Sequence, residues 1–301
     1  MELQGILAPL TATFATDGTL APDRLRHNIT RYNQTRLAGF VMNGSTGESV
    51  LLRWDEIYRI WETAKEAAAP GKILVAGSAT ESTGDTIEHT NRAASLGYDF
   101  ALVRTPHFYK PQMTIDAEAE YYLRVADAAR IPILVYSVPI FTQYQVEASL
   151  IARVAKHPNI VGMKDSSGDV AGVKKIIEAA PREFRTLVGS ASTLFESLEI
   201  GAVGAILALA CAFPELCCEI YDLSREGDKP GAHALAQKLI VPAKVLGAHY
   251  GIPGLKYTLD RIGYYGGPPR PPLLPVTAEA KPEIDAMLSN VLMQTATSNR
   301  N

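Results

Sequence analysis

A lysine stands directly after a short apolar run near the middle of the chain. Residues 160–163 (IVGM) predict a buried strand, and Lys164 follows them as the first residue of KDSSG. Removal from water disfavours a charged ammonium group, so at the mouth of a buried strand we expect Lys164 to be a free amine for part of the time. A free amine is a nucleophile for ketones. The same lysine could instead extend its amine into solvent, and this stretch alone does not exclude that arrangement.

Two further groups could assist such an amine. Tyr136 ends an apolar run inside LVYSVP, and residues 43–48 (NGSTGE) follow another. A ketone that condenses with Lys164 needs a proton moved on and off its carbinolamine, which suits the Tyr136 hydroxyl relayed through Thr46. The backbone N–H groups of Ser45 and Thr46 could hold a carboxylate beside the ketone. Taken singly, Tyr136 could be a core tyrosine and the loop a simple turn.

The histidines and cysteines do not indicate a metal site or a disulfide framework. The six histidines are scattered without the spacing of metal ligands, and only His107 is expected at the carboxyl end of a strand, as a wall residue. We predict no metal, so an iminium on Lys164 would stabilise any carbanion. The three cysteines, Cys211, Cys217 and Cys218, lie in one apolar stretch and predict buried thiols.

One unit recurs along the chain: a short apolar run, a turn rich in Gly, Ser, Thr or Pro, and an amphipathic segment. Eight runs predict strands, at residues 6–14, 39–42, 73–76, 100–103, 133–136, 160–163, 186–188 and 202–209. Leu25, Ile29 and Tyr32 share one face of the first helix between them. Two pairs have the spacing of a capping box at a helix start: Ser82 with Asp85, and Thr193 with Glu196.

Eight such units predict an α/β fold, a (β/α)8 TIM barrel with helices outside. An open doubly wound sheet is the competing fold, but no G-x-G-x-x-G follows the first strand. In a barrel the reacting groups gather at the carboxyl ends of the strands, so Lys164, Tyr136 and residues 43–48 would open into one pocket.

The alternation of apolar runs and amphipathic segments ends at about Glu226. After it, only helical patterns follow, at residues 231–249, 255–262 and 282–293. We therefore expect a catalytic barrel, residues 1–226, and a C-terminal helical region, residues 227–301, packed on the barrel. This region is also a candidate subunit contact.

Composition limits the classes of partner. Of the 301 residues 47% are hydrophobic, enough for a large core, and the net charge of -3 comes without a basic cluster. These values argue against nucleic acid or a membrane surface as partner. The longest uncharged stretch, residues 200–214, is shorter than the roughly 20 residues of a membrane-spanning helix, and no leader precedes the first apolar run. We expect a cytoplasmic protein.

Three strings resemble the signatures of the dihydrodipicolinate synthase and N-acetylneuraminate lyase superfamily, the class I pyruvate aldolases. They are GSTGE (44–48), YSVP (136–139) and VGMKD (161–165). Longer strings are particularly similar to 4-hydroxy-2-oxoglutarate aldolase: HPNIVGMKDSSGDV (157–170), GSA (189–191), GIPGLK (251–256) and GYYGGPPRPPL (263–273). The resemblance extends over essentially the whole chain.

This resemblance implies a barrel with a C-terminal helical region, usually in a homotetramer, and no cofactor. It implies that Lys164 forms the Schiff base with pyruvate and that Tyr136 donates and accepts the proton. The implied substrate contacts are Ser45 and Thr46 for the pyruvate carboxylate, the backbone at Ile206 in GAILAL, Ser190 in GSA, and Phe141 in the outer pocket.

Two positions depart from the family pattern. Synthases of the lysine pathway usually carry an arginine for the second substrate's carboxylate where this chain has Phe141, and phenylalanine cannot pair a carboxylate. Their relay also borrows a tyrosine from a neighbouring subunit, and the matching position is Phe108, with Tyr109 beside it. The relay between subunits would need Tyr109 instead.

The function expected is a lyase that cleaves a 2-oxo-4-hydroxy acid to pyruvate and an aldehyde. Phe108, Ile140 and Phe141 suggest a partly apolar outer pocket, compatible with a sugar-acid fragment, an aromatic aldehyde or glyoxylate. The first alternative is dihydrodipicolinate synthase, which condenses pyruvate with aspartate semialdehyde. A non-catalytic barrel that senses a 2-oxo acid is the second, although a sensor would need no proton relay.

Overall fold

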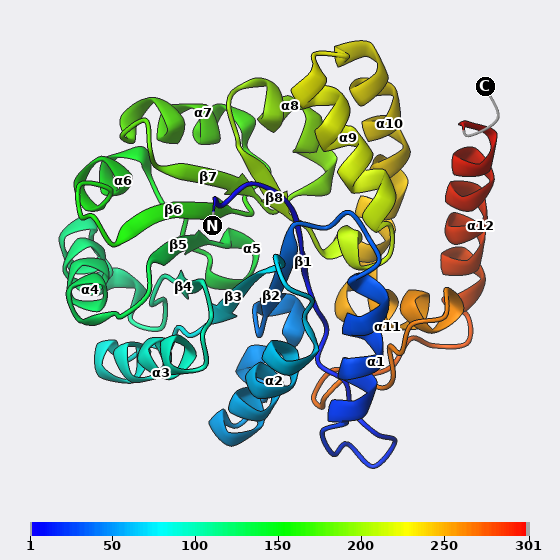
Figure 1. Ribbon diagram of the computed structural model, residues 1–301, viewed down its shortest axis with the longest axis horizontal. Coiled ribbons are helices and arrows are strands. Elements are labelled where there is room, and N and C mark those ends of the chain that lie inside the picture. Colours follow the sequence, from blue (N-terminus) through cyan, green and yellow to red (C-terminus); the bar gives the residue numbers. More distant parts are fainter. Residues whose placement is uncertain (1, 299–301) are drawn as a thin grey trace.

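The computed structural model describes residues 2–298, in which eight parallel strands close into a barrel surrounded by helices (Figure 1). Neighbouring strands pair in chain order, and the last strand pairs with the first. The strands are β1 Gly5–Pro9, β2 Gly39–Met42, β3 Ile73–Gly77, β4 Phe100–Arg104, β5 Ile133–Ser137, β6 Ile160–Asp165, β7 Arg185–Val188 and β8 Gly204–Ile206. The predicted (β/α)8 TIM barrel is confirmed, and its C-terminal helices are present.

The barrel closes between β1 and β8 through two glycines. Gly5 pairs with Gly204, and a Cβ atom on Gly204 would lie 2.1 Å from the carbonyl oxygen of Gly5. No side chain fits at such a distance, so closure at this point depends on glycine.

The first and last predicted strands are longer than the observed ones. The chain leaves the sheet after Pro9, although residues 10–14 stay buried, and the run after β8 continues as a 3-10 turn at Ala208–Cys211. Both runs are largely buried although they lie outside the sheet, and periodicity cannot separate a short buried strand from a buried turn.

The helices between the strands bury the faces that the sequence predicts. Leu25, Ile29 and Tyr32 are all buried in α1. Ser82 accepts the predicted hydrogen bond from the Asp85 N–H at 3.2 Å. The capping box predicted at Thr193 is wrong, because its hydroxyl bonds the Ser190 carbonyl instead. The barrel helices are α1 Pro22–Tyr32, α2 Trp54–Ala67, α3 Thr83–Ser95, α4 Ile115–Ala128, α5 Pro139–Thr142, α6 Ala148–Val154, α7 Val170–Ala179, α8 Leu194–Glu199 and α9 Pro214–Glu226.

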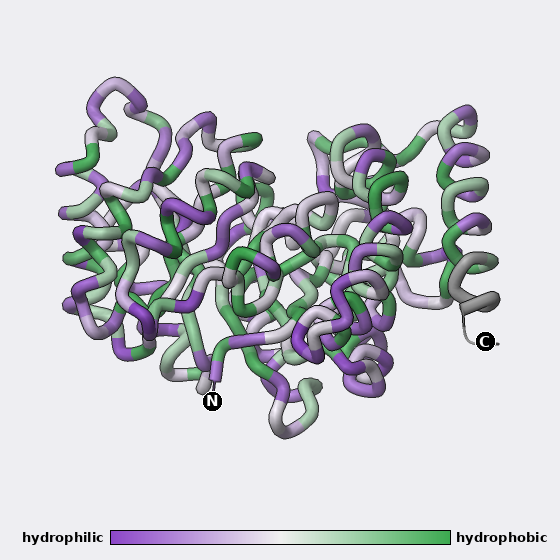
Figure 2. Tube along the Cα trace, turned by 90° about the horizontal axis from the view of Figure 1, so that it is seen from above, coloured by the Kyte–Doolittle hydropathy of each residue, from purple (hydrophilic) through white to green (hydrophobic). Residues whose placement is uncertain are grey.

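The C-terminal helices cover one side of the barrel, next to α1 and α9 (Figure 1). They are α10 Lys229–Pro242, a π-helix η6 Ala243–His249, α11 Gly251–Arg261 and α12 Lys281–Ser298. Figure 2 shows hydrophilic and hydrophobic residues alternating along α12, and its buried residues Ile284, Met287, Leu288 and Val291 lie on one face. The division of the chain at residue 226 stays a prediction. None of the helices within residues 2–298 is long and apolar enough to span a bilayer.

Candidate active site

A cavity of about 330 Å³ opens at the carboxyl ends of the barrel strands and extends to η6 and α11. It brings together residues that are far apart in the sequence, because the carboxyl ends of all eight strands meet at one face of the barrel. All seven site residues named from the sequence line it: Ser45, Thr46, Tyr136, Phe141, Lys164, Ser190 and Ile206.

Lys164 lies at the end of β6, beside Tyr136 of β5 in the strand register. Its side chain is 5% exposed, and Nζ lies 4.6 Å from the centroid of the Tyr136 ring. Within residues 2–298 no group forms a hydrogen bond or an ion pair with this nitrogen. The amine of Lys164 is therefore enclosed by the protein and has no counter-ion. That this amine attacks a ketone stays a prediction.

The next residue, Asp165, does not serve as that counter-ion. Its carboxylate accepts the backbone N–H of Ser167 at 2.9 Å and also bonds the Ser167 hydroxyl. Burial raises the pKa of this carboxyl group above its ordinary value, although the bonds from Ser167 act in the opposite direction. Asp165 therefore closes the turn after β6 and leaves Lys164 unpaired.

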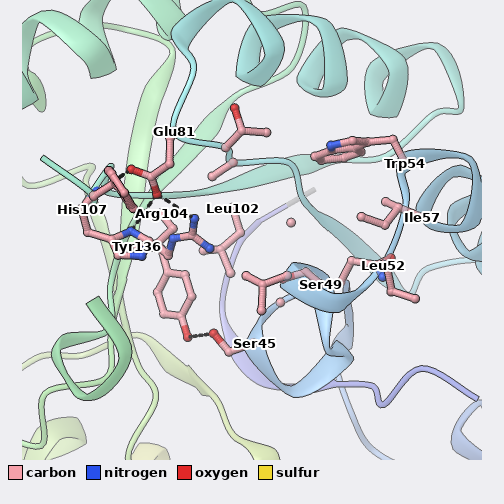
Figure 3. Close-up of a pocket in the computed structure, with 17 residues that line it drawn as sticks. Ser45, Ser49, Leu52, Trp54, Ile57, Glu81, Leu102, Arg104, His107 and Tyr136 are labelled. Carbon is pink, nitrogen blue, oxygen red and sulfur yellow. Dashed lines mark hydrogen bonds and ion pairs between the residues drawn. The ribbon is translucent and has the colours of Figure 1, made fainter. Parts of the chain in front are cut away.

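The Tyr136 hydroxyl lies 3.3 Å from the hydroxyl of Ser45, within hydrogen-bond distance (Figure 3). The sequence suggested Thr46 as the relay partner, but the structure pairs Tyr136 with Ser45. Ser45 and Thr46 are consecutive in the 3-10 turn Ser45–Gly47 (η1), and successive side chains of such a turn point about 120° apart. Only one of the two can therefore face the phenol directly.

Two residues near this turn, one before Gly44 and one directly after Gly47, adopt a backbone conformation that non-glycine residues rarely take. Asn43 has φ 55° and Glu48 has φ 56°. The first N–H groups of a helical turn have no partner inside it, so the N–H groups of Ser45 and Thr46 remain available to an anion. Such strained conformations persist only where the surrounding contacts hold the backbone in place, and they are common at functional sites.

The opposite wall contains hydroxyl groups that the sequence analysis did not single out. Ser166 and Ser192 line the cavity together with Ser190, and the hydroxyls of Ser190 and Ser192 are 2.9 Å apart. A Cβ atom on Gly189 would lie 2.0 Å from Ser166 Oγ and 2.9 Å from Lys164 Cε. Ser166 follows Lys164 by two residues, and residues at this spacing in an extended chain point to the same side. This spacing could have identified Ser166 from the sequence.

The mouth of the cavity is apolar. Ile140 and Phe141 are 67% and 61% exposed at its rim. Phe108 lines a neighbouring cavity instead. Tyr109 packs edge-on against the Phe108 ring, with 5.2 Å between the ring centroids, and Tyr109 is 68% exposed. That Tyr109 takes the role of the relay tyrosine missing at Phe108 stays a prediction.

A second cavity, of about 390 Å³, shares Tyr136 and Ser45 with the first (Figure 3). Glu81 organises its polar end, accepting the backbone N–H groups of His107 at 2.8 Å and Phe108 at 3.0 Å. Burial raises the pKa of Glu81, but these bonds and the nearby charges outweigh it and hold the pKa below its ordinary value. His107 is thus a wall residue, as expected, and belongs to this second cavity.

Comparisons with known proteins agree with this architecture. The profile of the dihydrodipicolinate synthetase family matches residues 2–291. The chain is 32% identical to the 4-hydroxy-tetrahydrodipicolinate synthase of Xanthomonas campestris pv. campestris, covering 100% of this chain and 98% of that protein. It is 29% identical to the synthase of the same name from Methanothrix thermoacetophila, with 96% and 97% covered.

Two solved structures share the fold closely. The 4-hydroxy-tetrahydrodipicolinate synthase of Methylacidiphilum fumariolicum SolV superimposes with a TM-score of 0.94 at 25% identity, over 99% of both chains. The dihydrodipicolinate synthase of Acinetobacter baumannii, complexed with pyruvate, gives 0.92 at 27% identity, over 96% of this chain and 99% of that one. The chain therefore belongs to the dihydrodipicolinate synthetase family, whose members are class I Schiff-base enzymes that act on pyruvate.

Proposed function

We propose that this enzyme is a pyruvate-dependent class I aldolase that cleaves a 2-oxo-4-hydroxy acid to pyruvate and an aldehyde, as 4-hydroxy-2-oxoglutarate aldolase does. The observation that supports this most is the buried, unpaired amine of Lys164 beside the Tyr136 ring, in one cavity with Ser45 and Thr46. Such an amine suits attack on a ketone, and the phenol beside it suits proton transfer.

The proposed reaction begins when Lys164 Nζ attacks the C2 carbonyl and the carbinolamine loses water to give an iminium. The C3–C4 bond then breaks as the 4-hydroxyl loses its proton, and the bonding electrons move into the iminium to give an enamine and a free aldehyde. Tyr136 carries this proton and returns one to C3. Water then hydrolyses the iminium, which releases pyruvate and restores the amine.

The remaining predicted residues would bind substrate. The N–H groups of Ser45 and Thr46 would hold the carboxylate beside C2, with the backbone at Ile206 beneath the pyruvate portion. Ser190 would contact the leaving half of the substrate, and Phe141 would cover it at the rim. Among the described residues that line the cavity, Lys164 is the only Asp, Glu, His, Lys or Arg.

The second candidate is dihydrodipicolinate synthase, which the names of the relatives favour. Phe141 argues against it, because the second substrate of that enzyme carries a carboxylate and phenylalanine offers no cation to pair with it. The same argument disfavours glyoxylate as the aldehyde half and favours an aldehyde without a carboxylate. Two assays separate the candidates. One measures pyruvate release from a panel of 2-oxo-4-hydroxy acids, and the other measures condensation of pyruvate with aspartate semialdehyde. Faster turnover in the coupling assay than with every acid would favour the synthase.

Borohydride reduction in the presence of pyruvate tests the shared first step. We expect mass spectrometry to find one reduced pyruvate adduct, on Lys164, and no adduct in the Lys164→Ala variant. An unmodified Lys164 in the wild-type protein would remove the Schiff-base mechanism.

We also propose that the enzyme is a cytoplasmic homotetramer. The large, exposed side chains of Phe108 and Tyr109 are suited to a contact between subunits. Sedimentation velocity at micromolar protein concentration tests this, and a single species with the mass of one chain would contradict it.

A further inference from the structure

The turn that carries Ser45 and Thr46 ends at a buried carboxylate. Glu48 follows the turn in the left-handed conformation, and its backbone N–H bonds the Ser45 carbonyl at 3.1 Å. The Glu48 side chain is fully buried, so it needs charged or hydrogen-bonding partners. Those partners come from the C-terminal region and not from the barrel.

Lys256 of α11 is the main partner. Its Nζ lies 2.6 Å from Glu48 Oε1, and its side chain is 1% exposed. The same nitrogen donates to the Pro268 carbonyl at 2.9 Å and lies 4.5 Å from the centroid of the Phe14 ring. The ion pair is therefore enclosed on every side, and water cannot replace either member.

The loop after α11 supplies the second contact. The backbone N–H of Arg270 donates to Glu48 Oε2 at 2.7 Å. The Arg270 guanidinium is itself fixed by two bonds to Glu56, at 2.9 and 3.1 Å. Both oxygens of Glu48 are thus held by groups whose own positions are fixed.

We propose that Glu48 and Lys256 are positioning residues that hold the turn of Ser45 and Thr46 in place over the pyruvate site. This inference rests on the proposed function, because it takes those two N–H groups as the carboxylate site. Leu255, the neighbour of Lys256, lines the cavity itself, so one helix both forms the wall and anchors the turn. A turn that ends at a residue held in the left-handed conformation would relax if its anchor were lost.

The Lys256→Met variant tests the proposal, because it keeps the side chain unbranched and of similar length while removing the ammonium group that contacts Glu48 and the Pro268 carbonyl. Borohydride trapping is measured over a range of pyruvate concentrations, well below the melting temperature of each variant. We expect the half-saturating pyruvate concentration to rise about tenfold, the effect of weakening a hydrogen bond to a charged group. A Lys256→Met protein that folds and keeps this concentration within about twofold of wild type overturns the proposal.

Leu150→Ala is the matched control for stability. Leu150 is fully buried in α6, on the far side of the barrel from α11 (Figure 1), so its truncation lowers the melting temperature without touching the turn. We expect the half-saturating concentration to stay within about twofold of wild type. A rise equal to that of Lys256→Met would mean that general destabilisation explains both, and it overturns the proposal.

Glu48→Gln decides the question if Lys256→Met does not fold. Glutamine keeps the size of the side chain and an acceptor for the Arg270 N–H, but it puts an amide NH2 in place of the carboxylate oxygen that faces Lys256, so the ion pair is lost. We expect a severalfold rise in the half-saturating concentration, and no change overturns the proposal. The wild-type protein separates the two hypotheses: if it forms no adduct, the proposed function fails, whereas an adduct formed equally well by wild type and variants refutes only the anchor.

Discussion

Replacing Glu118 by glutamine is expected to remove most of the pH dependence of stability between about pH 5 and 8. Glu118 lies on α4 and is fully buried, and neither of its carboxyl oxygens has a hydrogen-bond partner within residues 2–298. Burial raises the pKa of this group from 4.5 to about 8, and the negative charge of Glu81 acts in the same direction. The folded protein therefore holds the proton far more tightly than the unfolded chain.

The sign and size of the effect follow from this difference. Stability from the protonated group is fully present below pH 4.5, where both states carry the proton, and it is lost as the pH rises to about 8. The free energy of unfolding falls by about 1.4 kcal/mol for each pH unit in that interval. The total loss is about 5 kcal/mol, an upper value because the unfolded chain is treated as fully solvated.

Urea unfolding followed by far-UV circular dichroism, at a fixed protein concentration from pH 5 to 8, measures this loss. The difference in unfolding free energy between Glu118→Gln and wild type is expected to grow steadily with pH. Glu120→Gln is the control, because Glu120 is on the same helix but is exposed and paired with Arg124. If Glu118→Gln and wild type lose stability in parallel, the assignment of the pH dependence to this carboxyl group is wrong.

Two predictions concern the active site. Tyr136→Phe is expected to lower kcat for cleavage by about a hundredfold or more, while pyruvate is still trapped on Lys164. Steady-state measurement of pyruvate release checks this, and a kcat within about threefold of wild type would exclude Tyr136 as the proton carrier. Gly189→Ala places a methyl group 2.0 Å from Ser166 Oγ and 2.9 Å from Lys164 Cε, so we expect trapping on Lys164 to slow about tenfold. Unchanged trapping kinetics in a folded Gly189→Ala protein would show that the wall can move aside.

The sequence by itself determined the barrel and most of the candidate site. Alternation of apolar runs with amphipathic segments predicts the eight strands, because each pattern depends only on neighbours within one element. Once the strands are parallel, their carboxyl ends share one face, so Lys164, Tyr136 and the turn of Ser45 and Thr46 could be assigned to one pocket before any contact was known.

Only the tertiary structure decided which side chains meet there. The pairing of Tyr136 with Ser45 depends on the rotation of a single 3-10 turn, and the burial of Glu118 depends on which face α4 turns to the barrel. The pairing of Glu48 with Lys256 joins residues that no local pattern connects. Such contacts depend on the relative placement of whole elements, and a periodicity within one element carries no information about that placement.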